Sequence, residues 1–128
     1  MQLRTIPLPW TTLVVASEND AFFPATPFME APSITTIRRA MEIAAEFGDM
    51  EVAVAYQTAD VENAPDTPVA FGGFQSTIDV FYPDALTNIA SVTAGKQLIR
   101  FGFVARNKSG QGTTPSMMRI GGRVESAS

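Results

Sequence analysis

The sequence predicts an all-β fold, an antiparallel β-sandwich with an extended N-terminal arm. Short stretches in which apolar and polar residues alternate recur along the chain, and residues that favour turns separate them, which is typical of strands joined by turns. No stretch shows a secure helical pattern. The 128 residues, 45% of them hydrophobic, suffice for one domain with its own core. About seven short strands are expected.

Proline dominates the N-terminal segment. Residues 1–34 hold five of the nine prolines, namely Pro7, Pro9, Pro24, Pro27 and Pro32. Because proline has no backbone N–H, we expect no central strand or helix here, and only Thr11–Ala16 reads as a strand. The sequence therefore predicts an arm over residues 1–34 and a sandwich domain over residues 35–128. The arm packs either on its own domain or on a neighbouring subunit, and both alternatives stay open.

Residues 37–57 decide the fold class, because their first half reads either as a helix or as a strand. A helix would have an apolar stripe formed by Ile37, Ala40, Met41, Ala44 and Phe47. A strand would have one apolar face formed by Ile37, Met41, Ile43, Ala45 and Phe47, with Arg39 as the exception. Residues 50–57 also alternate, and Gly48-Asp49 suits a two-residue turn. We therefore expect a hairpin of two strands.

Further strands are expected downstream, at 69–74, 76–82, 97–106 and 116–125. The strand at 97–106 is the clearest, and its inward face is formed by Ile99, Phe101, Phe103 and Ala105. Residues 85–95 are expected to form a loop or a single helical turn, and residues 107–116 a loop.

The composition excludes several classes of function. The chain has no cysteine and no histidine, which removes disulfides, thiol nucleophiles, the usual zinc sites and every Ser-His-Asp arrangement. We therefore expect no catalytic residue, no cofactor and no bound metal. No apolar run is long enough to span a membrane, and Pro7 and Pro9 interrupt the N-terminal run, so no secretion signal is expected.

Charge is distributed unevenly along the chain. Up to Asp84, three basic residues stand against twelve carboxylates, whereas six basic residues stand against one carboxylate from Lys96 onward. If these segments lie side by side in the fold, their charges neutralise each other. If they lie apart, the molecule has an acidic and a basic end, and copies of it attract one another. The first alternative is favoured.

Three groups of residues are candidate ligand sites. The loop 60–66 offers four oxygen-bearing side chains but lacks the spacing of an EF-hand, so a solvated turn is favoured over a calcium site. Trp10, Tyr56 and Tyr82 could stack on sugars, but the two tyrosines share a face with apolar neighbours and are expected in the core. The arginines of the last two strands would form a basic face only if those strands pair, so no nucleic-acid partner is expected.

Three short motifs carry a resemblance, and they are Tyr56-Gln57-Thr58, Asp66-Thr67-Pro68 and Arg100-Phe101-Gly102. Together with the strand order, they make residues 36–125 similar to small jelly-roll proteins in the virions of tailed bacteriophages. The region more distantly resembles carbohydrate-binding β-sandwich modules. Many such sandwiches carry a tryptophan in the acidic loop, whereas the one tryptophan here is Trp10.

The resemblance implies a non-enzymatic virion protein, either a capsid decoration or a head-tail or tail component, made in the host cytoplasm. It would act as a homo-oligomer that packs against copies of itself and neighbouring virion proteins, without nucleic acid or membrane. A carbohydrate-binding module for receptor recognition is the alternative. The expected interface residues are Trp10, Phe22, Phe23, Phe28, Arg100, Arg106, Arg119 and Arg123.

Overall fold

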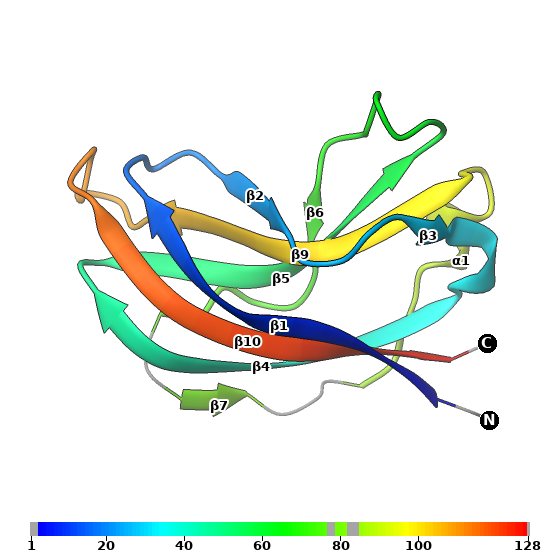
Figure 1. The fold of residues 1–128 in the computed structure, drawn as a ribbon, viewed down its shortest axis with the longest axis horizontal. Coiled ribbons are helices and arrows are strands. Elements are labelled where there is room, and N and C mark those ends of the chain that lie inside the picture. The colour runs from blue at the N-terminus through cyan, green and yellow to red at the C-terminus, as the bar shows by residue number, and fades with distance from the viewer. Residues whose placement is uncertain (1–2, 77–78, 82–84, 128) are drawn as a thin grey trace.

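Two antiparallel sheets face each other in the computed structural model, which describes residues 3–76 and 85–127 and the backbone of residues 79–81 (Figure 1). The first sheet has the order β1 (Leu3–Val15), β10 (Ser116–Ala127), β4 (Thr36–Phe47) and β7 (Asp79–Phe81), with β8 (Thr87–Asn88) also paired to β4. The second has the order β2 (Ala21–Pro24), β9 (Leu98–Asn107), β5 (Met50–Ala59) and β6 (Val69–Ala70), with β3 (Met29–Glu30) also paired to β9. One 3-10 turn, η1 (Ala31–Ser33), and one helical turn, α1 (Ala90–Thr93), complete the described elements.

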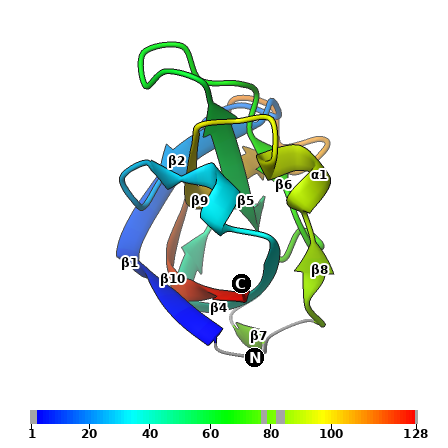
Figure 2. The same ribbon diagram turned by 90° about the vertical axis from the view of Figure 1, so that its right-hand side faces the viewer.

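The strand pairing is nested, which defines a jelly roll. The outermost pair is β1 with β10, the next is β2 with β9, and these enclose β4 with β7 and β5 with β6. Such a ribbon of pairs closes into two sheets when β10 pairs with β4 and β9 pairs with β5. Seen from the side, the sheets curve around a common interior (Figure 2), and the start of β1 lies beside the end of β10, where Leu3 pairs with Ala127. The predicted β-sandwich is therefore confirmed.

The core consists of the inward faces of the two sheets. Its largest fully buried side chains are Phe101, Phe103, Leu8, Leu13, Ile34, Ile37, Met41, Ile43, Ile99, Met118, Ile120 and Val52. The alternation predicted for residues 97–106 is confirmed, since β9 buries its apolar face while Arg100 and Arg106 point outward and are half-buried. Each such apolar side chain contributes about 1.5–3 kcal/mol on burial.

Residues 36–47 form a strand, as predicted, but the predicted hairpin is wrong. β4 pairs with β10 in the first sheet, whereas β5 pairs with β9 in the second, so Gly48-Asp49 crosses between the sheets. Gly48 has φ +86°, and the Asp49 N–H donates to Ser116 Oγ at 3.2 Å. A glycine with positive φ is compatible both with a hairpin turn and with a connection between two sheets. The residues of the turn alone therefore could not distinguish the two arrangements.

The outer end of β4 also differs from the prediction. Ile37, Met41 and Ile43 are buried as expected, but Ala45 and Phe47 are exposed. The register with β10 shifts between Ile43 and Ala45, so one extra residue interrupts the alternation. A one-residue bulge reverses the side to which every later side chain points, and this places Phe47 on the outer surface.

The N-terminal segment contains more β-structure than predicted. β1 runs from Leu3 to Val15 rather than only over Thr11–Ala16, and residues 21–24 and 29–30 pair with β9. β1 tolerates Pro7 and Pro9 because it is an edge strand whose register shifts between Leu8 and Thr11. Residues 1–34 thus contribute paired strands to both sheets, and the division of the chain at residue 34 stays a prediction.

The remaining elements agree in outline with the prediction. The strand expected at 69–74 is regular only over Val69–Ala70, and that expected at 76–82 is regular over Asp79–Phe81. The rest of the latter prediction, including Tyr82, lies partly outside the described residues. Residues 85–95 were expected to form a loop or a single helical turn, and the structure has a helical turn there, α1.

We expect Leu13→Ala to lower the free energy of unfolding by about 2–5 kcal/mol, because Leu13 is buried and its loss leaves a cavity. Its neighbour Val14 points outward, so Val14→Ala is expected to change that free energy by less than about 0.5 kcal/mol. Urea unfolding of both variants at several protein concentrations provides the measurement. Equal effects, or a loss that depends on concentration, would contradict packing of β1 on its own chain.

Gly48→Ala is expected to destabilise the chain more than Gly110→Ala. Both glycines have positive φ, at +86° and +95°, so alanine is strained by about 1–2 kcal/mol at either position. A Cβ at Gly48 would also lie 2.5 Å from Ser116 Oγ, whereas a Cβ at Gly110 meets nothing within 4 Å. Thermal unfolding of the two variants isolates the contact, and equal losses would argue against the corner packing on β10.

Candidate functional site

An aromatic cleft lies between the edges of the two sheets. It has a volume of about 390 Å³ and is lined by Pro9, Trp10, Thr11, Thr12, Leu13, Phe22, Phe23, Pro24, Ala25 and Phe103. β1 supplies one wall and β2 with its following residue supplies the other. Trp10 lies where the register of β1 shifts, and the irregular backbone there turns its ring outward, so that 44% of the residue is exposed.

Trp10 packs on the backbone of β10. A Cβ built on Gly121 would come within 3 Å of the indole, so only glycine lets the ring lie this close to the strand. The Arg119 guanidinium carbon lies 5.6 Å from the ring centroid, within the range of a cation–π interaction. Gly121 is therefore the position at which the indole lies against β10.

Arg100 holds two further aromatic side chains beside the cleft. Its guanidinium carbon lies 4.4 Å from the Phe28 ring centroid and 5.7 Å from that of Phe22. Its Nε donates to Gln57 Oε1 at 2.8 Å, which fixes the guanidinium over the outer face of the second sheet. The cation–π contacts and the hydrogen bond of Arg100 therefore hold the Phe22 and Phe28 rings in one arrangement at the rim of the cleft.

The structure brings six of the eight expected interface residues to one region. Trp10, Phe22 and Phe23 line the cleft. Phe28, Arg100 and Arg119 adjoin it through their ring contacts. Their role in an interface stays a prediction.

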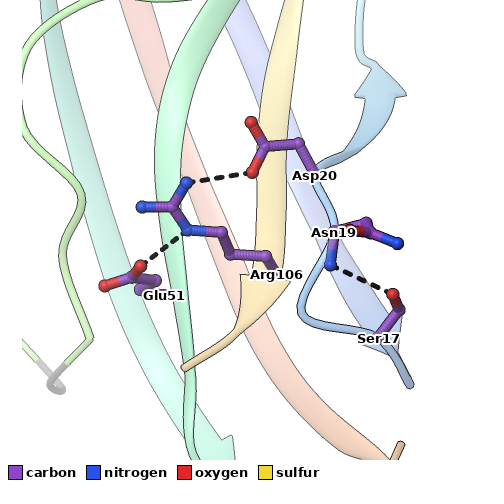
Figure 3. Close-up of polar contacts among 5 residues, drawn as sticks. All are labelled: Ser17, Asn19, Asp20, Glu51 and Arg106. Atoms are coloured by element: carbon purple, nitrogen blue, oxygen red, sulfur yellow. Dashed lines mark hydrogen bonds and ion pairs between the residues drawn. The ribbon is translucent and has the colours of Figure 1, made fainter. Parts of the chain in front are cut away.

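Arg106 lies elsewhere and ties three segments together (Figure 3). Its Nε donates to Glu51 Oε1 at 2.7 Å and its Nη1 donates to Asp20 Oδ1 at 3.1 Å. The pKa of the Arg106 guanidinium is raised, chiefly by the hydrogen bond to Glu51. Within the connection from β1 to β2, the Asn19 N–H donates to Ser17 Oγ at 3.0 Å. The residue expected to contact a partner thus fixes a loop of its own chain.

Arg123 is engaged in its own chain as well. Its Nε lies 3.2 Å from Glu125 Oε1, and Arg38 Nη2 lies 3.1 Å from Glu125 Oε2. The Arg38 hydrogen bond, with that of Arg123, lowers the pKa of the Glu125 carboxyl. Since β9 and β10 lie in different sheets, the four expected arginines form no common basic face. Acidic and basic segments lie side by side, as the favoured alternative predicts.

Lys96 of the same chain forms ion pairs with two carboxylates of the acidic loop 60–66. Lys96 Nζ lies 2.9 Å from Asp66 Oδ2 and 3.7 Å from Asp60 Oδ2, and Thr58 Oγ1 donates to Asp66 at 2.8 Å. The Lys96 and Thr58 hydrogen bonds lower the pKa of Asp66, while Asp66 raises that of Lys96. In the described part of the chain, no cluster of three or more potential metal ligands is found.

Tyr56 does not offer a platform for a sugar. It is buried, its ring centroid lies 6.1 Å from that of Phe71, and burial raises the pKa of its hydroxyl. The prediction that it belongs to the core is confirmed.

An exposed apolar row on the outer face of the first sheet was not predicted. Val14, Met117 and Phe47 are register neighbours on β1, β10 and β4, and they are 54%, 45% and 68% exposed. A hollow of about 220 Å³ beside them is lined by Thr12, Ala45, Glu46, Phe47, Met117 and Arg119. We name Val14, Met117 and Phe47 the apolar row. The alternation in the sequence does not reveal the row, because the bulge in β4 moves Phe47 to the opposite face of the sheet. The adjacent pair Met117-Met118 was the one available signal, since one of two neighbouring residues in a strand must point outward.

The fold defines a class, the jelly-roll β-sandwich, which occurs among viral capsid and lectin domains. No family model and no curated protein matches the chain. Among solved structures, the chain is similar to one titled as the Gx strain of infectious bursal disease virus, with a TM-score of 0.65 and 9% identity over 97% of this chain and 32% of that one.

Two further similar structures concern the VP2 protein of the same virus. One is of derived T=1 particles, with a TM-score of 0.64 and 9% identity over 97% of this chain and 31% of that one. The other is of a subviral particle, with a TM-score of 0.59 and 11% identity over the same shares. This chain spans about a third of the length of these neighbours. The likeness establishes the fold. Within the described residues, no helix is long and apolar enough to cross a membrane.

Asp66→Asn is expected to lower the urea midpoint near neutral pH, because it removes the ion pair with Lys96. The folded-state pKa of Asp66 is lowered, so its stabilising contribution is present above the ordinary value of 3.8 and is lost as the pH falls through the folded value. The difference between variant and parent should therefore vanish in strong acid. Asp60→Asn is the control, since that carboxylate is farther from Lys96 and should matter less. A difference that persists in acid would contradict the ion-pair account.

Proposed function

We propose that this chain is a non-enzymatic structural protein of a virion that acts by packing against copies of itself and other virion proteins. The observation that carries the proposal is the nested strand order, shared over 97% of the chain with proteins of a virus and of its derived particles. Identity of 9–11% carries no functional detail, so the assembly role rests on the fold together with the surfaces of this chain.

Two surface features support this role. The aromatic cleft and the apolar row expose Trp10 and Phe47, large apolar residues of the kind that concentrate in protein interfaces. In addition, many of the charged side chains pair within the chain, which leaves apolar contact as the main attraction between copies.

The finer assignment within this role is to the virion of a tailed bacteriophage, as a capsid decoration or a head-tail or tail component. It follows from the sequence resemblance over residues 36–125, and the structural neighbours belong to a different kind of virus. The absence of cysteine and histidine from the sequence supports a role without catalysis.

The test is the mass of the purified chain by light scattering over a range of concentrations, combined with electron microscopy of the same samples. We expect defined oligomers or particles that grow with concentration and tolerate added salt, because apolar contact dominates. A chain that stays monomeric throughout, and whose Trp10 fluorescence responds to sugars, would contradict the proposal and favour a carbohydrate-binding module.

A further inference from the structure

We propose that the acidic loop 60–66 of one copy of this chain inserts its tip into the aromatic cleft of a second copy. This inference rests on the proposed function and names the two surfaces that meet. The loop and the cleft are complementary in shape, in apolar surface and in charge.

The acidic loop 60–66 is a preformed projection. It connects β5 to β6 and stands out from the body of the sandwich in both Figure 1 and Figure 2, and all of its residues before Asp66 are exposed. At its base the Asp66 N–H donates to the Thr58 carbonyl at 2.8 Å, and at its tip the Ala64 N–H donates to the Val61 carbonyl at 3.1 Å. Because these bonds already fix the loop, inserting it into a partner costs little conformational entropy.

The tip of the loop and the cleft both expose apolar surface. Val61 is 54% exposed at the tip, where turns usually carry polar residues or glycine. The cleft has a volume of about 390 Å³ and presents the Trp10 side chain, whose ring already lies against β10 at Gly121. In the contact, Val61 packs on the exposed side of the Trp10 indole, and the ring needs no rearrangement to receive it.

The cleft has positive charge at its margin that no carboxylate compensates. None of the described residues that line it is acidic. Arg119 and Arg100 adjoin the cleft through their contacts with its aromatic rings, from β10 and β9. Neither of these arginines forms an ion pair with a carboxylate that the structure describes. A negatively charged segment is therefore favoured as the occupant.

The acidic loop carries the opposite charge. It has three carboxylates and no basic residue, and Lys96 pairs with two of the three. The third, Glu62, has no ion pair within the described part of the chain. Glu62 directly follows Val61, so when the loop enters the cleft its carboxylate meets the Arg119 guanidinium of the second copy. Apolar packing then supplies affinity, and the ion pair sets the orientation of the loop.

The contact joins copies rather than closing within one chain. The cleft lies at the edges formed by β1 and β2, whereas the loop follows β5, and β9 separates β2 from β5 in the second sheet. Each copy therefore donates one loop and receives another. Such a heterologous contact continues from copy to copy and generates rings or larger assemblies.

Sedimentation velocity on the full chain tests the role of the loop tip. We expect Val61→Asp to raise the apparent Kd of self-association at least about tenfold, since a charge replaces the apolar side chain that enters the cleft. Val92→Asp is the matched control, because Val92 is also exposed, at 38%, but lies on α1, and it should leave Kd within about twofold. Circular dichroism and urea unfolding show whether each variant keeps its fold.

The emission of Trp10 reports on the cleft itself, because the chain has no other tryptophan. We expect the emission of the parent to shift to shorter wavelength as the chain assembles, since Val61 of a second copy removes water from the indole. At the same concentrations, the emission of Val61→Asp should stay at the wavelength of the dilute parent.

Charge exchange and cross-linking test which residues meet. Arg119→Glu and Glu62→Arg should each weaken association, and the double variant should recover most of the parental affinity. The chain has no cysteine, so Val61→Cys and Thr12→Cys proteins, mixed and oxidised, should form a disulfide-linked pair, because Thr12 lines the cleft. A mixture of Val92→Cys and Thr12→Cys should not.

The outcomes separate this inference from the proposed function. If the parent assembles without a change in Trp10 emission, if Val61→Asp assembles as well as the parent, or if the double charge variant is no better than the single ones, the loop contact is overturned and the structural role stands. A parent that remains monomeric at every concentration overturns the contact and removes support from the structural role as well.

Discussion

The pairing of the last strand, β10, with β1 on one side and β4 on the other is the constraint on which the rest of the structure depends. β10 lies between β1 and β4 over almost its whole length, so residues more than a hundred positions apart in sequence form the centre of the first sheet. Leu3 pairs with Ala127 and Val15 with Ser116, which fixes the inward faces of both strands. Without this closure, neither β1 nor β4 would have a long partner, since β7 and β8 are short. Contacts of such sequence separation make folding slow, because loop closure precedes any gain from packing.

How much the sequence predicts follows from this constraint. Alternation of apolar residues locates strands such as β9 and β4, because that period is a local property of a half-buried strand. Sheet membership is not local. The alternation in β4 and β5 is compatible both with a hairpin and with two strands in facing sheets, and only the competition from β10 and β9 decides between them. The prolines of β1 led to the prediction of too short a strand for a related reason. An edge strand pairs along only one side of its backbone, so it tolerates residues that lack an N–H.

The candidate surfaces were predictable only in part. Aromatic residues in a segment poor in strand signals marked Trp10, Phe22 and Phe28 as unusual, and the structure gathers them around one cleft and its rim. The apolar row depends instead on a single extra residue in β4, which turns Phe47 from the core to the outside. Alternation alone cannot reveal such a shift, because it becomes visible only against the partner strand.

Register shifts and ion pairs together determine which large apolar side chains are exposed and which charged side chains are paired within the chain. The register shifts in β1 and β4 turn Trp10 and Phe47 outward, and both then lie on or beside the strand β10. Lys96, Arg106 and Glu125 meanwhile use their charges to join segments of their own chain. Because Trp10 and Phe47 both lie on or beside β10, the closure by β10 that builds the core also positions the exposed aromatic side chains of the first sheet.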